Sequence, residues 1–244
     1  MLLKAAINGG RTTDEFPGVP LTATEIARDA AAALAAGATV VHAHARTADG
    51  GQTIEPEHIG ELVRAFRAAA PDGEIGTTTG LWTCSGHAER MRLVAAWPAD
   101  ALPDFASVAF SEDGAAEAAE LVLERGMVLE SAVWSMADVP ALLASPTLHR
   151  NVRILIEPEV ESPEEAVAVC REVAAALRAG GVTAPLLYHG YDATVWPVVR
   201  AAVEDGCETR IGLEDGLTRE DGSLASGNEE LVRAVLALEA VPTA

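Results

Sequence analysis

Val40-Val41-His42-Ala43-His44-Ala45-Arg46 is the stretch of sequence from which both the fold and the site can be developed. Its β-branched residues lead into alternating polar and small side chains, a pattern typical of a β-strand. Side chains alternate between the two faces of a strand, so His42, His44 and Arg46 share one face. Two imidazoles on one strand can turn ring nitrogens toward one divalent metal, and zinc sites commonly use such nitrogens. The alternative is a pair of buried histidines with hydrogen-bond partners inside the protein.

Strands and helices alternate eight times along the chain. Helix starts are marked by Thr22 with Glu25 three residues later, the spacing of a capping box, and by Ser162 followed by Pro163. No composition break or long linker separates the units, which is typical of a parallel α/β domain. Strands are predicted at residues 3–7, 40–46, 74–79, 105–110, 127–134, 152–156, 185–189 and 209–213, and helices at 22–37, 56–69, 88–96, 115–125, 137–143, 162–177, 195–203 and 228–239.

Eight such units in 244 residues predict a (β/α)8 TIM barrel, a single domain over residues 1–244. Barrels of this kind typically need ~250 residues. A doubly wound open sheet is the alternative. However, the first strand is not followed by G-x-G-x-x-G, and the chain has no G-x-x-x-x-G-K-[ST] motif.

The formal net charge of -20 at pH 7 argues against polyanionic partners such as DNA, RNA or an anionic membrane surface. Aromatic residues make up only 4% of the chain, which leaves few stacking platforms for nucleic acid. We therefore expect small-molecule partners.

The three cysteines, Cys84, Cys170 and Cys207, are widely spaced and odd in number, which is not a disulfide framework. This usage fits a reducing, cytoplasmic compartment. The first residues enter a short strand without the long apolar run of a signal peptide, and no run of ~18 apolar residues suggests a membrane span.

Polar side chains gather where the predicted strands end. A barrel carries its active site at the carboxyl ends of its strands. By period two, Arg210, Gly212 and Glu214 face the barrel interior, and barrel closure brings this last strand beside the first. Glu214 can then complete a His2Glu metal site, with Gly212 leaving space beside the ion or substrate. The other polar ends are 8–11, 77–80, 107–112, 130–131, 157–159 and 189–191.

Several polar residues at these ends have two interpretations each. Asp215 has the opposite parity to Glu214 and reaches the site only if the strand ends there, as Gly216 suggests. Arg46 and Arg210 either pair with carboxylates in the structure or bind a substrate carboxylate and orient Asp215. His189 is either a structural histidine or a ligand or acid-base group. Of the three threonines at 77–79, one hydroxyl near Gly80 can bind substrate, and the others suit a strand.

Together, these motifs resemble the β-keto acid cleavage enzymes, whose best-known members cleave 3-keto-5-aminohexanoate. The resemblance spans nearly the whole chain in order, and the combination of H-x-H-x-R with R-x-G-L-E-D is more specific than either motif alone. It rests on Asn-Gly-Gly at 8–10, Ala-Gly-Ala-Thr-Val-Val-His-Ala-His-Ala-Arg at 36–46, Thr-Thr-Thr-Gly at 77–80, Thr-Arg-Ile-Gly-Leu-Glu-Asp at 209–215 and Asn-Glu-Glu-Leu-Val at 228–232.

The resemblance implies a barrel that binds a zinc-like divalent metal and assembles as a homo-oligomer, a dimer or tetramer. It also implies an acyltransferase-type reaction in which a β-keto acid and acetyl-CoA give acetoacetate and a new CoA thioester. Carried over by position, His42, His44 and Glu214 are the metal ligands, Asp215 is the general base with Arg210 as its partner, and Thr78 contacts substrate.

The sequence departs from the family pattern at two substrate positions. Arg11 stands where the aminohexanoate-cleaving members carry a glutamate for the substrate amino group. We therefore expect 3-keto-5-aminohexanoate to be a poor substrate and a neutral or second acidic β-keto acid to be preferred. Glu112 lies near a usual hydroxyl, and the fourth strand lacks the usual asparagine. Arg11, Arg46, Thr78 and Glu112 are the predicted substrate-binding residues, and trimmed loops leave the CoA partner less secure than the metal.

Two other functions remain open at this point. A metal-dependent barrel hydrolase that does not use CoA also employs H-x-H, usually on the first strand with further histidines later, where only His189 is available. A catalytically silent barrel acting as a binding or regulatory subunit is the third reading. The set His42, His44, Glu214 and Asp215 argues against it.

Overall fold

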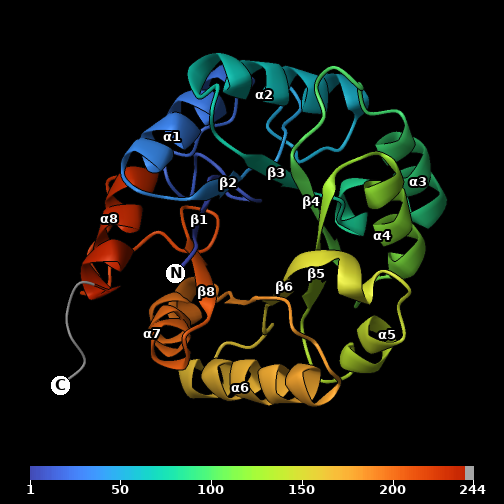
Figure 1. Cartoon of the computed structure of the whole chain (residues 1–244). Coiled ribbons are helices and arrows are strands. Elements are labelled where there is room, and N and C mark those ends of the chain that lie inside the picture. The colour runs from blue at the N-terminus through green and yellow to red at the C-terminus, as the bar shows by residue number, and fades with distance from the viewer. Residues whose placement is uncertain (240–244) are drawn as a thin grey trace.

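The computed structural model describes residues 1–239, in which eight parallel strands close into a barrel in the order β1 to β8 (Figure 1). β1 pairs with β2 on one side and β8 on the other, so the sheet has no open edge. The predicted (β/α)8 barrel is confirmed, and the open-sheet alternative is wrong. The strands are β1 Leu3–Ala6, β2 Val40–His42, β3 Ile75–Thr78, β4 Phe105–Ala109, β5 Val128–Val133, β6 Asn151–Ile156, β7 Leu186–Tyr188 and β8 Glu208–Ile211.

The helices form a ring outside the strands (Figure 1). The predicted capping box at Thr22 is present, because its hydroxyl accepts from the Glu25 amide and the Glu25 carboxylate accepts from the Thr22 amide. Ser162 caps α6 in the same way, with Pro163 in the first turn. The helices are α1 Ala23–Ala35, α2 Pro56–Ala69, α3 His87–Ala95, α4 Ala115–Glu124, α5 Val139–Leu143, α6 Pro163–Ala179, α7 Val195–Asp205 and α8 Asn228–Glu239, with 3-10 turns at Leu81–Thr83, Leu148–Arg150 and Asp192–Thr194.

Two strands are shorter than predicted, and both end beneath the site. β2 stops at His42 rather than Arg46, since the Asn8 side chain takes over its pairing. The Asn8 amide accepts from the His44 backbone N–H at 2.9 Å and donates to the His44 carbonyl at 3.0 Å. β8 stops at Ile211, and the chain turns so that the Asp215 amide bonds the Gly212 carbonyl at 3.0 Å. These early ends free the chain to aim successive side chains into the barrel mouth.

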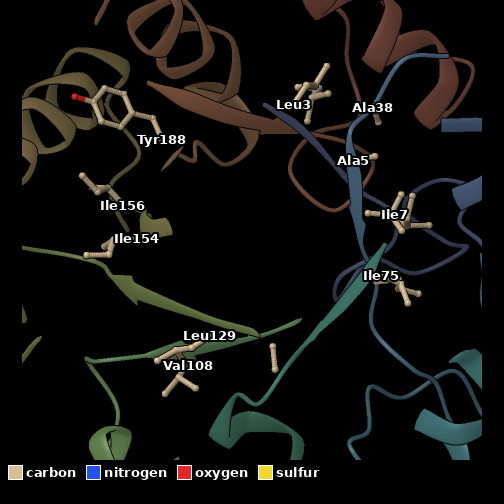
Figure 2. Close-up of a cluster of buried hydrophobic side chains, with 14 of the residues drawn as sticks. Leu3, Ala5, Ile7, Ala38, Ile75, Val108, Leu129, Ile154, Ile156 and Tyr188 are labelled. Carbon is tan, nitrogen blue, oxygen red and sulfur yellow. The ribbon is translucent and has the colours of Figure 1, made fainter. Parts of the chain in front are cut away.

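Apolar side chains fill the space between strands and helices. Leu3, Ala5 and Ile7 of the first strand segment point to this layer, with Ile75 of β3 beside them (Figure 2). The alternate residues face the barrel interior, where Ala109, Ala132, Leu155 and Leu187 form a second apolar cluster. The interior is therefore a packed core on which the site rests.

Buried ion pairs cross the barrel interior. Lys4, the single lysine of the sequence, is 2.5 Å from the Glu130 carboxylate, and both side chains are fully buried. Arg153 also pairs with Glu130 and reaches Glu208 at 2.7 Å. This network ties β1, β5, β6 and β8 together.

The cysteines and the helices agree with two simpler expectations. Cys84, Cys170 and Cys207 are unpaired thiols. Among residues 1–239, no helix combines the length and the apolar character needed to cross a bilayer.

Candidate active site

His42 from β2, His44 just beyond it and Glu214 beyond β8 meet at the mouth of the barrel. The two Nε2 atoms are 2.9 Å apart, and the Glu214 Oε1 atom lies 4.0 Å from His42 Nε2 and 3.7 Å from His44 Nε2. The three potential ligand atoms all lie within 4.8 Å of one another. Within residues 1–239, no other group of three His, Cys, Asp or Glu side chains converges in this way.

Burial sets the protonation of these three side chains. Desolvation lowers the pKa of His42 well below its usual value and also lowers that of His44, so both imidazoles are neutral at pH 7. Burial alone would raise the pKa of Glu214, but Arg210 and the two histidines outweigh it and keep this carboxyl ionised. Two neutral imidazoles and a carboxylate are the donor set that zinc takes in His2Glu sites.

The set also has spare donor capacity. Glu214 Oε2 and His42 Nδ1 are buried, and neither has a hydrogen-bond partner in the protein. A buried carboxylate oxygen without a partner is unfavourable unless an ion or water satisfies it. The side chains therefore fit a divalent cation.

Asp215 lies beside the three potential ligands in a chain of ionised groups. Its carboxylate accepts from Arg210 at 2.5 Å and from His189 Nε2 at 2.8 Å, while His189 Nδ1 is 3.3 Å from Glu157. Burial and Arg210 disfavour the imidazolium, yet Asp215 and Glu157 outweigh them and raise the pKa of His189 to about 9. Arg210 and His189 in turn hold the pKa of Asp215 below its usual value against the effect of burial.

A pocket with a cavity volume of about 820 Å³ opens above these groups. His44, Arg210 and Glu214 line its floor, and Thr78 and Ser107 line one side. Its rim combines aromatic side chains with exposed carboxylates: Trp82, Trp134, Tyr191, Glu159 and Glu161. The volume suits a small-molecule ligand.

Thr78 is the threonine of its run that faces this pocket. Its hydroxyl accepts from the Gly80 amide at 3.0 Å and lies on the pocket wall. Thr77 and Thr79 instead donate to the carbonyls of Ala43 and Ser107, each at 2.8 Å. The run therefore divides as its alternation indicates, with one hydroxyl at the site and two holding neighbouring strands.

The other predicted substrate residues lie outside the pocket lining. Arg46 donates to the carbonyls of Asn8, Gly9, Arg11 and Gly50, which fastens the chain after β1 to the chain after β2. Glu112 pairs with Arg90 at 2.7 Å and accepts from the Leu81 amide at 2.8 Å, which anchors the 3-10 turn after β3.

Arg11 likewise faces away from the cavity. Its guanidinium pairs with Asp192 and with Glu15 at 3.2 Å, and its Nε donates to the Glu214 carbonyl at 3.3 Å. It also stacks over the Tyr191 ring, 4.6 Å from the centroid. The free positive charge expected here is therefore neutralised by two carboxylates.

The interpretation of Gly212 needs correction. A Cβ at Gly212 would lie 1.9 Å from the Ala6 carbonyl oxygen and 2.7 Å from Asn228 Oδ1, so this glycine permits contact with β1 and α8 rather than leaving room for an ion. Gly9 is the glycine that abuts the site. A Cβ there would lie 2.2 Å from the Cγ atom of Glu214.

Four site residues escaped the sequence analysis as individuals: Gln52, Trp82, Trp134 and Glu157. Two of them had a usable signal. Counting by two along β5 from the inward Glu130 reaches Trp134, and counting along β6 from the inward Arg153 reaches Glu157. Gln52 and Trp82 lie in loops, where no such period applies.

A closed eight-stranded parallel barrel with ionisable side chains gathered at its carboxyl ends defines an enzyme of the (β/α)8-barrel class. The chain belongs to the family of β-keto acid cleavage enzymes, whose sequence pattern matches residues 1–240.

Relatives with assigned activities cover nearly the whole chain. The 3-keto-5-aminohexanoate cleavage enzyme of Acetoanaerobium sticklandii is 28% identical over 98% of this chain and 91% of its own length. The 3-oxoadipate:acetyl-CoA acetyltransferase of Cupriavidus necator is 27% identical over 97% of this chain and 87% of its own length.

Solved structures share the barrel. ObcA in complex with oxaloacetate superposes with a TM-score of 0.75 at 19% identity, covering 91% of this chain and 63% of that one, so this chain spans less than two thirds of ObcA. The 3-dehydroquinate dehydratase of Geobacillus kaustophilus superposes with a TM-score of 0.60 at 15% identity, covering 97% of this chain and 90% of that chain. At these identities the likeness concerns the fold alone.

Proposed function

We propose that this protein cleaves a β-keto acid in a reaction with acetyl-CoA, giving acetoacetate and a new CoA thioester. The observation that carries the proposal is the convergence of His42, His44 and Glu214 within 4.8 Å, with Asp215 beside them beneath one pocket. The names of the relatives support the reaction class, since one acts on a β-keto acid and another joins a β-keto acid with acetyl-CoA.

His42, His44 and Glu214 would hold a zinc-like divalent ion. Such an ion supplies Lewis-acid polarisation of a keto oxygen. The protein contributes neutral imidazoles, a carboxylate kept ionised by Arg210, and a buried carboxylate oxygen with no protein partner.

Asp215 is the proposed general base. Its ionised carboxylate, held by Arg210 and His189, would take a proton from the methylene group between the keto and carboxylate carbons of the substrate. Arg210 and His189 fix the orientation of this carboxylate, and Thr78 offers a hydroxyl on the adjacent wall. The Glu157 carboxylate orients His189 from the other side.

The overall reaction balances with these two substrates alone. The bond between the keto carbon and the methylene carbon of the β-keto acid breaks, and the methylene carbon bonds to the acetyl carbon of acetyl-CoA to form acetoacetate. The remaining acyl group is transferred to the thiol of CoA. No oxidant, reductant or water is consumed.

The substrate preference expected from Arg11 loses its stated cause, because Asp192 and Glu15 neutralise that guanidinium. Poor turnover of 3-keto-5-aminohexanoate stays a prediction to be tested with a panel of substrates. The homo-oligomeric assembly, a dimer or tetramer, and the cytoplasmic location are also proposals. Light scattering after size exclusion tests the assembly.

A panel of β-keto acids tests the function. The zinc-loaded protein is incubated with each acid, with and without acetyl-CoA, and acetoacetate and CoA esters are followed by mass spectrometry. Asp215→Asn should abolish product, whereas the surface control Asp100→Asn, which alters an exposed pair with Arg64, should not. Acetoacetate that requires acetyl-CoA supports the proposal.

Products that form without acetyl-CoA would instead support the metal-dependent hydrolase. That reading needs a further histidine ligand, and His189 bonds Asp215 and Glu157 rather than joining the three potential ligands. Absence of any product from zinc-loaded protein would contradict both enzymatic proposals and favour a binding role.

A further inference from the structure

We infer that Gln52 is a positioning residue that fixes the ring tautomer of His44, with Trp82 fixing Gln52 in turn. The inference deepens the proposed function, because it concerns the readiness of one proposed ligand to bind the ion. It rests on one oxygen atom that two donors share. Gln52 Oε1 lies 2.5 Å from His44 Nδ1 and 3.3 Å from Trp82 Nε1.

The backbone carries Gln52 to this place by a short hairpin beyond β2. The Thr47 amide bonds the Gly51 carbonyl at 2.9 Å, and the Thr53 amide bonds the Ala45 carbonyl at 3.1 Å. On the other side, a Cβ at Gly10 would lie 2.9 Å from the Gln52 Nε2 atom. The side-chain amide is therefore enclosed between the hairpin and the chain that follows β1.

Trp82 decides which end of the amide faces His44. An indole N–H can only donate, so its partner must be the amide oxygen rather than the NH2 group. The reversed amide would bring two donors together at this contact. Trp82 is 54% exposed and lines the pocket, so this bond joins the rim of the pocket to its floor.

The orientation of Gln52 then dictates the protonation of His44. An amide oxygen can only accept, so the proton of the neutral ring must lie on Nδ1. The lone pair is left on Nε2, the atom that faces His42 Nε2 and Glu214. The metal-free protein therefore holds His44 in the one tautomer that can donate to an ion without rearrangement.

Outer partners of metal-ligating histidines typically contribute ~10–100-fold to metal affinity. Zinc affinity is measured by competition with a chromophoric chelator. We expect Gln52→Leu to weaken zinc binding by ~10–100-fold. Gln52→Glu, which keeps an acceptor at the same place, should restore most of the affinity. Trp82→Phe should weaken binding by only ~3–10-fold, the equivalent of one hydrogen bond.

Trp134→Phe is the matched control. Trp134 also lines the pocket, but its indole N–H donates to Glu157 at 3.2 Å and touches no proposed ligand. Its zinc affinity should match that of the unaltered protein. Thermal melts of all four variants check that each is folded.

A second readout requires neither metal nor activity. Nitrogen NMR of 15N-histidine-labelled, metal-free protein distinguishes the two neutral tautomers of a ring. His44 should carry its proton on Nδ1, and Gln52→Leu should populate the Nε2–H form. An Nε2–H ring in the unaltered protein, or zinc affinity within twofold in Gln52→Leu, would overturn the inference. Failure of the cleavage assay alone would contradict only the proposed reaction.

Discussion

Replacing Gly9 by alanine tests how the site holds Glu214. Gly9 has a φ of +45°, and a Cβ there would lie 2.2, 2.9 and 2.8 Å from the Cγ, Cβ and Cδ atoms of Glu214. The first of these is far inside van der Waals contact, so the Glu214 side chain must move. Because the main chain at 214 is held to the Ala6 carbonyl at 3.3 Å, we expect the carboxylate rather than the backbone to shift.

The magnitude has two parts. An alanine in the left-handed region costs ~1–2 kcal/mol of stability. Displacing Glu214 removes one of three proposed ligands, which should weaken zinc binding by at least the ~100-fold that the loss of an outer partner can reach. Gly206→Ala is the matched control, since Gly206 has a φ of +68° and open space where its Cβ would lie.

Both variants are compared with the unaltered protein by thermal melting and by zinc competition with a chelator. Gly9→Ala and Gly206→Ala should lose similar stability from their backbone conformation, and only Gly9→Ala should lose zinc affinity. Zinc affinity within twofold of the unaltered protein in Gly9→Ala would refute the reasoning. Equal losses of affinity in both variants would also refute it, because the effect would then come from general destabilisation.

Three further perturbations test the surrounding charges. Glu130→Gln leaves Lys4 and Arg153 buried without their shared carboxylate, so urea unfolding should show a loss of ~3–5 kcal/mol, whereas Lys4→Met should lose less because Arg153 still pairs with Glu130. The pKa of His189 rises from 6.5 to about 9 on folding, so its contribution is complete below pH 6.5 and lost as the pH rises through 9. His189→Gln should thus destabilise the metal-free protein by ~3 kcal/mol at pH 6 and hardly at pH 9.5, and a loss independent of pH would contradict this. Arg11→Met should weaken KM for acidic β-keto acids by exposing Asp192, and the double variant with Asp192→Asn should recover it. No recovery would mean that Arg11 binds the anion directly.

The barrel was predictable because its signals are local. Each strand and helix shows its own period, and caps such as Thr22 and Ser162 bond only to neighbours a few residues away. The ends of strands were less predictable. β2 ends at His42 because the Asn8 side chain, 36 residues from His44, pairs with that backbone. A contact of that sequence separation leaves no trace in the periodicity of either segment.

The site divides along the same line. The register of parallel strands brings His42, His44 and Glu214 together, so alternation and barrel closure suffice to predict that they meet. Arg11 and Arg46 bond mainly to carbonyl oxygens or to loop carboxylates, as with Asp192. Every residue type offers a carbonyl, so the sequence could not reveal that these guanidinium groups are already used.

The use of its arginines makes the site dependent on its ion for substrate binding as well as for chemistry. Arg210 is the one guanidinium among the described pocket-lining residues, and its N–H groups bond Glu214 and Asp215. With Glu157 and the His189 imidazolium, the innermost charges number three negative and two positive, a sum of about -1 that a divalent ion would reverse. One unit charge at ~8 Å contributes ~2 kcal/mol at an effective dielectric constant of 20.

Acetoacetate, a product of the proposed reaction, should therefore bind at least ~10-fold more weakly to chelator-treated protein than to zinc-loaded protein in a calorimetric titration. The effect should persist in Asp100→Asn, whose exposed carboxylate pairs with Arg64 far from these charges. Equal affinity in both forms would mean that a cation of the chain itself receives the carboxylate. Because Arg210 bonds both neighbouring carboxylates, that outcome would require it to release one of them, and Arg210→Lys would then abolish the binding.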